Sequence, residues 1–496
     1  MADQVGGAVH PRHRRAGGDP APQKNLTWWD LTVFGVSVVV GAGIFTVTAS
    51  TFGNITGPAI SVSFVIAAVT CGLAALCYAE FASMLPVAGS AYTFSYATFG
   101  EFVAWIIGWD LILEFAVGAA VVAKGGRVTW GTVFGFSGGV AEIGPLNFDW
   151  GGALIIVAIV TTLLALGTKL SANVSAVITA IKVAVVAFVV IVGGAFLHQG
   201  GQLLPFVPAS ETGKGGASGT GVNQSVFSLL TGAESSHYGW YGVLAGASIV
   251  FFAFIGFDVV ATTAEETKNP QRDVARGILA SLAIVTVLYV SVSIVLSGMV
   301  RFSDLRDKAE DGHANLATAF SLNGGVDWAA KVISIGALAG LTTVVMVLIL
   351  GLSRVLFAMA RDGLLPRQLA KTGNRGTPVR ITVLVGVLTA VAATVFPIDK
   401  LEEMVNVGTL FAFILVSAGV IILRRTRPPD LERGFRAPLV PVLPILAIAA
   451  CGWLMLNLTG LTWIRFAVWM VIGVGFYLLY GRSHSVLARR EAATVS

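Results

Sequence analysis

Two glycine-containing breaks are the stretches of this sequence best suited to bind a small molecule. Gly41 and Gly43 interrupt an apolar segment at about 31–52, and Gly256 interrupts a second one at about 242–264. Glycine destabilises helix interiors, and irregular backbone at membrane depth is tolerated only where it is buried in protein or lines a cavity. Close helix packing would explain either break alone. The two together, at matched positions, favour a binding site.

The backbone chemistry of such breaks predicts what they bind. A helix that restarts presents free N–H groups and the positive end of its dipole, whereas a helix that stops presents free carbonyls. The first end suits a carboxylate and the second an ammonium group, so the pair suits an α-amino acid. The groups predicted to hold the carboxylate are the N–H groups of Ala42, Gly43 and Ile44. Those predicted to hold the amine are the carbonyls of Val39, Phe252, Ala253 and Ile255.

Ionisable side chains within apolar segments are functional candidates, because charge is costly in a bilayer. Lys182 lies too centrally in its segment to reach the interface, and a proton-coupling role is weighed against a structural ion pair. Glu114 shares a helix face with Asp110, and it is expected either to pair with Lys182, to shape a proton path or to belong to a structural network. Asp258 follows the second break, where it acts in coupling or gating or caps the restarting helix.

The predicted side-chain pocket is apolar, which favours small neutral amino acids. Its predicted residues on the eighth apolar segment are Leu341, Thr342 and Val345. Arg354, further along that segment, is expected to form an ion pair at the inner mouth. The charged stretch from Glu265 to Asp273 is either an ordinary solvated loop or, as its resemblance to a known family implies, a gate loop there.

Composition indicates lipid as the surrounding solvent. Of 496 residues, 55% are hydrophobic and 12% charged, with a mean hydropathy of +0.81; soluble proteins carry roughly 25% charged residues. The three cysteines lie in apolar segments and form no disulfide framework or metal motif. The histidines avoid the interiors of these segments, which argues against haem. There is no Walker motif, no catalytic or metal-ligand cluster and no signal peptide. We therefore expect neither an enzyme nor an ATP-driven pump, and no cofactor or metal.

Twelve apolar segments have the length needed to span a bilayer. They lie at about 30–53, 58–84, 101–124, 151–168, 173–197, 242–264, 276–299, 329–360, 379–396, 404–424, 439–459 and 463–481. With a cytoplasmic N-terminus, 21 of the 32 Lys and Arg residues fall on the inner side and 9 on the outer side, as the positive-inside rule requires. Both termini are then cytoplasmic.

The two breaks lie five spans apart, which indicates an inverted-repeat transporter. The predicted fold is an all-α integral membrane protein of 12 transmembrane helices. Helices 1 and 6 are broken, and helices 11 and 12 follow a 5+5 repeat. The predicted parts are an N-terminal tail (1–26), a transport core (27–424) with repeats at about 27–197 and 242–424, spans 11–12 with the preceding loop (425–481) and a C-terminal tail (482–496). The loop at about 198–241 is expected to be a flexible outer cover.

An ordered set of motifs resembles the cationic amino-acid transporter family of the amino acid–polyamine–organocation (APC) superfamily. The matching stretches are Gly41-Ala-Gly-Ile-Phe45, Ala88-Gly-Ser-Ala-Tyr92, Gly108-Trp-Asp-Leu-Ile-Leu-Glu114, Phe254-Ile-Gly-Phe-Asp258, Glu265-Glu-Thr-Lys-Asn-Pro-Gln-Arg-Asp273, Met359-Ala-Arg-Asp-Gly-Leu-Leu-Pro366 and Gly434-Phe-Arg-Ala-Pro438. The resemblance implies a LeuT-type fold and amino-acid transport. It also implies that Lys182 lies beside the broken first span, where a sodium ion would otherwise bind, and so implies proton coupling or a fixed charge in place of sodium.

The sequence thus predicts a secondary transporter of L-amino acids in the plasma membrane, a proton-coupled symporter of small neutral substrates. The alternatives are a carrier of lysine, arginine or ornithine, an exchanger, a sodium-coupled carrier and, from another class, a transporter-like nutrient receptor. The predicted partners are the amino acid, protons and membrane lipid, without nucleic acid; a small accessory membrane protein is left open.

Overall fold

The computed structural model describes most of the chain. The described residues are 25–84, 92, 95–96, 99–134, 138–143, 146–167, 172–197, 203–212, 221–232, 236–310, 314–323, 326–371, 378–426 and 434–486. Nearly all of the predicted N-terminal tail, the last ten residues and the stretch 88–91 of one family motif lie outside these ranges.

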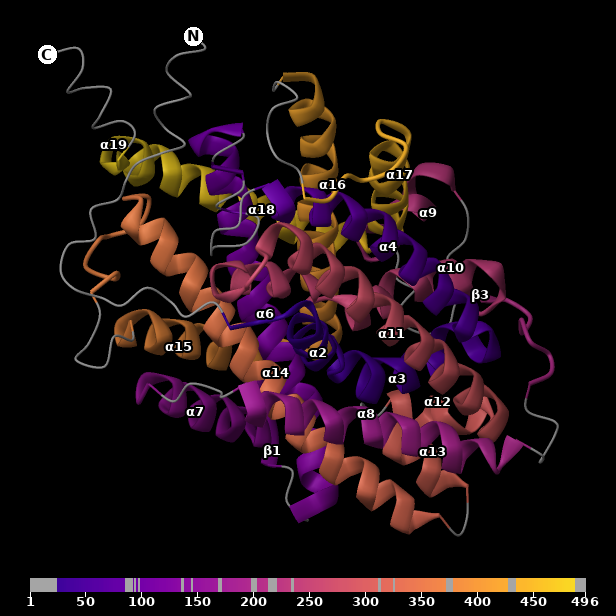
Figure 1. Ribbon diagram of the computed structural model, residues 1–496. Helices are drawn as coiled ribbons and strands as arrows, with labels where there is room; N and C mark the ends of the chain where they lie inside the picture. The colour runs from indigo at the N-terminus through magenta and orange to yellow at the C-terminus, as the bar shows by residue number, and fades with distance from the viewer. Residues whose placement is uncertain are drawn as a thin grey trace, which may run out of the picture.

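Helices account for nearly all of the described structure (Figure 1). The long helices are α4 (Ile60–Met84), α6 (Glu101–Phe134), α8 (Ala172–Gly194), α11 (Pro270–Met299), α14 (Asp327–Arg361), α16 (Ile398–Thr426) and α18 (Gly460–Phe476). Those of intermediate length are α2 (Trp28–Val39), α7 (Gly152–Ala165), α10 (Gly239–Val250), α15 (Val379–Val395) and α17 (Val442–Leu456). The short helical segments are η1 (Gly43–Val47), α3 (Thr48–Thr51), η2 (Phe52–Thr56), η3 (Gly57–Ala59), η5 (Gly221–Asn223), α9 (Val226–Thr231), η6 (Phe251–Phe254), η7 (Phe257–Glu266), α12 (Phe302–Glu310), α13 (Leu316–Leu322), η8 (Tyr477–Gly481) and α19 (Arg482–His484).

Two small antiparallel hairpins interrupt the helical architecture. Strand β1 (Gly138–Ile143) pairs with β2 (Leu146–Gly151), and the two-residue strands β3 (Glu211–Thr212) and β4 (Ser236–His237) pair across the predicted outer loop. Part of that loop is therefore ordered into a short strand pair and helix α9 rather than forming only a flexible cover.

The helices have the length and polarity of a multi-pass membrane protein. Eight helical segments in the described residues are long and apolar enough to cross a bilayer, and four more apolar helices are shorter. Large apolar side chains also face outward: Ile191 is 73% exposed and Leu479 is 86% exposed. Such side chains are expected where a helix faces lipid rather than water.

Two pairs of long helices form the centre of the molecule, and α2 lies against one member of each pair, α11 and α14 (Figure 1). Helices α6 and α14 run antiparallel, since Gly118 lies against Leu348 and Gly126 lies near Leu341. Helices α4 and α11 are also packed together: the ring of Phe64 contacts Tyr289, and the Ser297 hydroxyl donates to the Pro58 carbonyl just before α4. Small residues at these contacts allow close approach of the backbones.

A buried ion pair fixes the connection that follows α16. Arg424 donates two hydrogen bonds to the carboxylate of Glu80 on α4, at 2.9 and 2.6 Å, and a third to the carbonyl of Ala437. The N–H of Ala437 donates to Glu80 in return. The motif 434–438 is thus held against α4 and α16, and Gly434 in it has no room for a side chain beside the carbonyl of Gln271.

Candidate functional site

The first predicted break is present. Helix α2 ends at Val39, Val40 has extended backbone angles (φ −72°, ψ 94°), and the chain becomes helical again at the wide turn of η1, which begins at Gly43. The sequence change from valines to Gly-Ala-Gly explains this local structure, because glycine lowers the cost of leaving the helical conformation.

The second predicted break is also present. Helix α10 tightens into the 3₁₀ segment η6, and Ile255 then has extended backbone angles (φ −64°, ψ 142°). Gly256 follows with φ +109°, a conformation that glycine adopts without steric cost. A Cβ atom at Gly256 would lie 2.7 Å from the side chain of Val38, so this glycine also permits close contact with the end of α2.

The two breaks cross each other at Gly43 and Ala253. A Cβ atom added to Gly43 would lie 2.2 Å from the Cα atom of Ala253. Gly43 is therefore needed for close packing of the two backbones, and the same contact brings both breaks together at the predicted binding site.

The N–H groups predicted to hold a carboxylate are free in the described structure. Phe45 donates to the carbonyl of Gly41, but none of the described residues accepts a hydrogen bond from the N–H groups of Ala42, Gly43 or Ile44. These groups lie at the first turn of η1, where the helix dipole is positive. The local backbone therefore supplies donors for an anion.

The carbonyls predicted to hold an amine differ in their availability. The Val39 carbonyl accepts a hydrogen bond of 2.8 Å from the buried hydroxyl of Tyr289, and the Phe252 carbonyl accepts one from the N–H of Ile255 at 3.2 Å. A carbonyl oxygen has two lone pairs, so an amine would have to share these two oxygens. Tyr289 was not singled out by the sequence analysis, because a tyrosine in an apolar segment is unremarkable.

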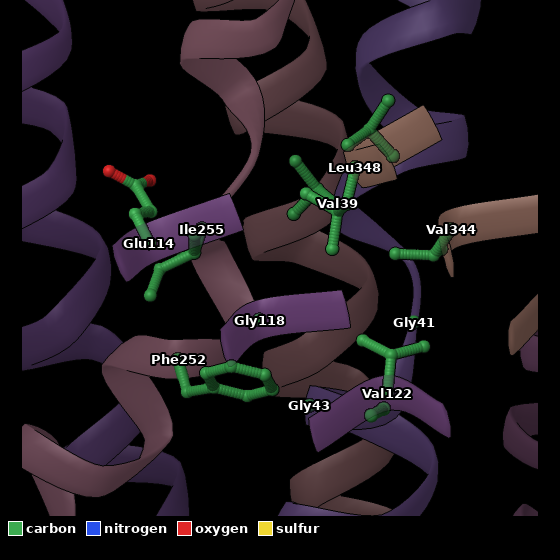
Figure 2. A pocket seen from close by; sticks show the side chains of 12 residues that line it. Val39, Gly41, Gly43, Glu114, Gly118, Val122, Phe252, Ile255, Val344 and Leu348 are labelled. Carbon is green, nitrogen blue, oxygen red and sulfur yellow. The ribbon is translucent and has the colours of Figure 1, made fainter. Parts of the chain in front are cut away.

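A small cavity lies between the two breaks, α6 and α14 (Figure 2). Its volume is about 20 Å³, which is room for a water molecule. The residues lining it are Val38, Val39, Gly41, Ala42, Gly43, Glu114, Gly118, Val122, Phe252, Ile255, Val344 and Leu348. Of the residues predicted to bind the backbone of an amino acid, all but Ile44 and Ala253 line this cavity. An amino acid fits only if the walls move apart, so the structure is a closed form of the site.

The residues predicted on α14 for the side-chain pocket do not line this cavity, and they stay a prediction. Val344 and Leu348 line the cavity, whereas Leu341, Thr342 and Val345 do not. The cause is helix geometry. Thr342 lies about 200° around the helix from Val344 and Val345 about 100° from it, while Leu341 is on the cavity stripe but about two turns from Leu348. The apolar sequence of α14 does not mark which face is inward.

Lys182 lies beside the first break, as the family resemblance implies. It is fully buried on α8, and its Nζ donates a 2.6 Å hydrogen bond to the carbonyl of Ser37, two residues before α2 ends. Lys182 forms no ion pair with Glu114, since the described residues include no such contact. The expectation of a Lys182–Glu114 pair is therefore wrong: the backbone of the broken helix, and not a carboxylate, receives the lysine.

Three buried carboxylates lie near one another, and one of them, Glu114, lines the cavity. Asp110 and Glu114 lie on α6, and Asp258 lies at the start of η7, close enough to Glu114 to repel its charge. One oxygen of Glu114, one of Asp258 and both of Asp110 are buried without a hydrogen-bond partner among the described residues. Buried carboxylate oxygens without partners in apolar helices mark these residues as candidates for a functional role.

Polar contacts fix the chain at the starts of both broken segments. At the end where α2 begins, the N–H groups of Asn25 and Leu26 donate to the carbonyl of Glu266. The side chain of Glu266 lies 3.5 Å from Arg354, which confirms the expected ion pair of that arginine. The predicted gate loop thus contacts both the start of the first broken segment and α14.

Tyr238 makes the corresponding contacts just before α10, at the start of the second broken segment. Its hydroxyl donates a 2.5 Å hydrogen bond to the carbonyl of Gly53 and accepts one of 2.8 Å from Arg306, which also contacts Glu211 at 3.3 Å. The sequence analysis named neither Tyr238 nor Arg306. The only signal was that a tyrosine precedes Gly239 at the start of the second broken segment.

Comparison with known proteins finds one family model and several relatives that are named as permeases or transporters. A family model described as amino acid permease matches residues 26–477. The chain is 40% identical to the branched-chain amino acid permease BcaP of Bacillus subtilis (strain 168), over 95% of this chain and 96% of that protein. It is 37% identical to the methylthioribose transporter of the same organism, over 94% and 95%. It is 30% identical to the vacuolar cationic amino acid transporter 4 of Arabidopsis thaliana, over 94% and 92%.

Proposed function

The chain belongs to the amino acid permease family of the APC superfamily, and we propose that it is a proton-coupled symporter of small neutral L-amino acids in the plasma membrane. The observation that carries this proposal is the crossing of two broken helices at a cavity. There the free N–H groups of Ala42, Gly43 and Ile44 lie at the first turn of η1, the positive end of its dipole. An α-carboxylate placed on these groups leaves its amine near the carbonyls of Val39, Phe252, Ala253 and Ile255.

The walls of the cavity support a neutral aliphatic side chain. Val122 on α6 and Val344 and Leu348 on α14 line the cavity together with the broken segments (Figure 2). Apolar walls favour binding of an apolar side chain, whereas a charged side chain would lose its hydration there without compensation. The name of the BcaP relative, a branched-chain amino acid permease, agrees with this substrate class.

Coupling to protons is proposed for the buried ionisable groups on both sides of the cavity. Lys182 is bound to the carbonyl of Ser37, so a change in its charge would act directly on the end of α2. Glu114 lines the cavity, Asp258 lies close enough to repel its charge, and each has one buried oxygen without a hydrogen-bond partner among the described residues. A proton taken up there would accompany the substrate.

A LeuT-type architecture of twelve spans accounts for the helix arrangement. In an inverted 5+5 repeat, spans 2 and 7 correspond, as do spans 3 and 8, with opposite directions across the membrane. In this proposal α6 and α14, which run antiparallel, would be spans 3 and 8, and the packed α4 and α11 would be spans 2 and 7. We propose repeats at about 27–197 and 242–424, two further spans within 425–481, and cytoplasmic tails at 1–26 and 482–496.

A second candidate is transport of cationic amino acids. Glu114 lines the cavity and has a carboxylate oxygen without a partner, which would serve as a counter-charge for a lysine or arginine side chain. The Arabidopsis relative is named a cationic amino acid transporter. The sequence analysis predicted an apolar pocket and did not place Glu114 in the lining of the cavity.

Uptake into proteoliposomes tests both candidates. The purified protein is reconstituted, a pH gradient is imposed, and uptake of radiolabelled alanine, valine, leucine, lysine and arginine is compared. The proposal expects neutral amino acids to accumulate only with the gradient. Preferential uptake of lysine or arginine that Glu114→Gln abolishes would support the second candidate instead, and neutral uptake that ignores the gradient would disprove proton coupling.

A further inference from the structure

Helix α6 presents three residues to the cavity at intervals of four. They are Glu114, Gly118 and Val122, and they lie one above another on the same face of the helix. The outer two carry side chains into the cavity wall, and the middle one carries none. Gly118 therefore leaves a gap in this wall, opposite Val344 and Leu348 of α14 (Figure 2).

The glycine at this position is not required by helix packing. Elsewhere on α6, a Cβ atom at Gly108 would lie 2.9 Å from Met359 and one at Gly126 would lie 2.9 Å from Ile156. At Gly118 the nearest atoms would be Leu348 Cδ1 at 3.6 Å and Val405 Cγ1 at 4.0 Å. These are ordinary van der Waals distances, so a methyl group fits there in the closed, empty site.

Glycine within a long helix is less stable than alanine, because it loses more backbone freedom on folding. A glycine that packing does not need, in the wall of a substrate cavity, reserves volume for the substrate. We propose that Gly118 sets the upper size of the amino-acid side chain and allows branched aliphatic substrates such as valine, leucine and isoleucine. This inference rests on the proposed transport function and makes its substrate class more specific.

The geometry explains how one methyl group would discriminate. With the substrate carboxylate and amine at the broken backbones, its side chain extends between α6 and α14, where Gly118 faces Leu348. A methyl group at 118 fills the space that the far carbons of leucine or isoleucine need, whereas alanine ends before reaching it. A difference of one methylene in an apolar pocket changes discrimination by about 10- to 200-fold.

The experiment compares Gly118→Ala with Gly351→Ala in proteoliposomes. Gly351 on α14 is a matched control, since its added Cβ would lie 3.7 Å from Phe115 and 3.9 Å from Val259, outside the cavity lining. We expect Gly118→Ala to raise the KM for leucine and isoleucine about tenfold, with less than a twofold change for alanine. Gly351→Ala should leave the ratio of the KM for leucine to the KM for alanine unchanged.

Thermal stabilisation by each amino acid provides a second readout that does not depend on turnover. Leucine should stabilise the parent and the Gly351 variant but not the Gly118 variant, while alanine should stabilise all three. If Gly118→Ala changes the KM for every amino acid by the same factor, or changes none of them, the size-limit inference is overturned. The proposed transport function stands in that case. A parent protein that takes up no amino acid would overturn the proposed function and, with it, this inference.

Discussion

The Nζ atom of Lys182 lies 2.6 Å from the carbonyl oxygen of Ser37. This bond joins α8 to the last turn of α2, immediately before the backbone leaves the helical conformation at Val40. Lysine has three donors and no acceptor, and its charge is attracted to the carbonyl end of a helix. The lysine therefore holds the first break from one side, while Tyr289 holds it from another through the carbonyl of Val39.

Replacing Lys182 with methionine tests its coupling role. The variant keeps much of the apolar stem but cannot donate to Ser37 or carry a proton. We expect uptake driven by a pH gradient to fall about tenfold or more, within the range of coupling free energies in proteins, while exchange without a gradient continues. Lys331→Met on the exposed surface of α14 is the control. Gradient-driven uptake at the parental rate in the Lys182 variant would rule out coupling through this residue.

Much of the site could be predicted because its residues are anomalies in apolar sequence. Gly41, Gly43 and Gly256 are poor helix formers at places where a spanning helix should be regular, and Lys182 is a charge where charge is costly. Both breaks and the buried Lys182 were found in this way, whereas the position of Lys182 beside the first break was implied by the family resemblance. The family resemblance, extended along most of the chain, gave the class of transporter.

The rest depends on three-dimensional relationships that a single sequence does not record. The α14 wall was placed on Leu341, Thr342 and Val345 rather than on Val344 and Leu348, because a helix apolar on every face does not reveal its rotation. Tyr289 was missed since its role depends on a carbonyl far away in the sequence. The close contact of Gly43 with Ala253 likewise exists only once the two breaks cross.

The crossing of the breaks predicts different effects for two neighbouring glycines. A Cβ atom at Gly43 would lie 2.2 Å from the backbone of Ala253, whereas one at Gly41 would lie 3.2 Å from a methyl group of Val344 that can move by a few tenths of an ångström. Gly43→Ala should therefore lower the free energy of unfolding by about 1–3 kcal/mol and abolish substrate binding. Gly41→Ala should have the smaller effect on both.

Thermal unfolding of the two glycine variants in detergent, with and without alanine, makes the comparison. Equal stability and equal stabilisation by alanine in both variants would show that the backbones do not cross at Gly43.

The hydroxyl of Tyr289 gives a third prediction. Tyr289→Phe preserves the contacts of the ring with Phe64 and Phe254 but removes the hydrogen bond to the buried carbonyl of Val39. An unsatisfied buried carbonyl costs about 1–3 kcal/mol, so the variant should unfold at a lower temperature and transport more slowly. Tyr480→Phe, near the C-terminal end of α18, is the control. Parental melting temperature and uptake in Tyr289→Phe would contradict a bracing role for the hydroxyl.

The buried pair of Glu80 and Arg424 gives the fourth prediction. Glu80 is 1% exposed, and Arg424 is 25% exposed. Removing one partner of a buried pair leaves the other charge without compensation, which costs about 3–5 kcal/mol in fully buried cases. Because Arg424 is partly exposed, Arg424→Ala should lower the free energy of unfolding by about 3 kcal/mol, the lower end of that range. Arg425→Ala, at an exposed neighbouring position, should have almost no effect.

A double-mutant cycle separates the pair from its packing. Glu80→Gln combined with Arg424→Met removes both charges and keeps most of the volume, so the double variant should be more stable than Arg424→Met alone. The N–H of Ala437, which donates to Glu80 at 2.8 Å, retains an acceptor in the glutamine oxygen. Thermal unfolding of the four proteins gives the coupling energy. If the two single losses simply add in the double variant, the ion pair does not hold the 434–438 segment against α4 and α16.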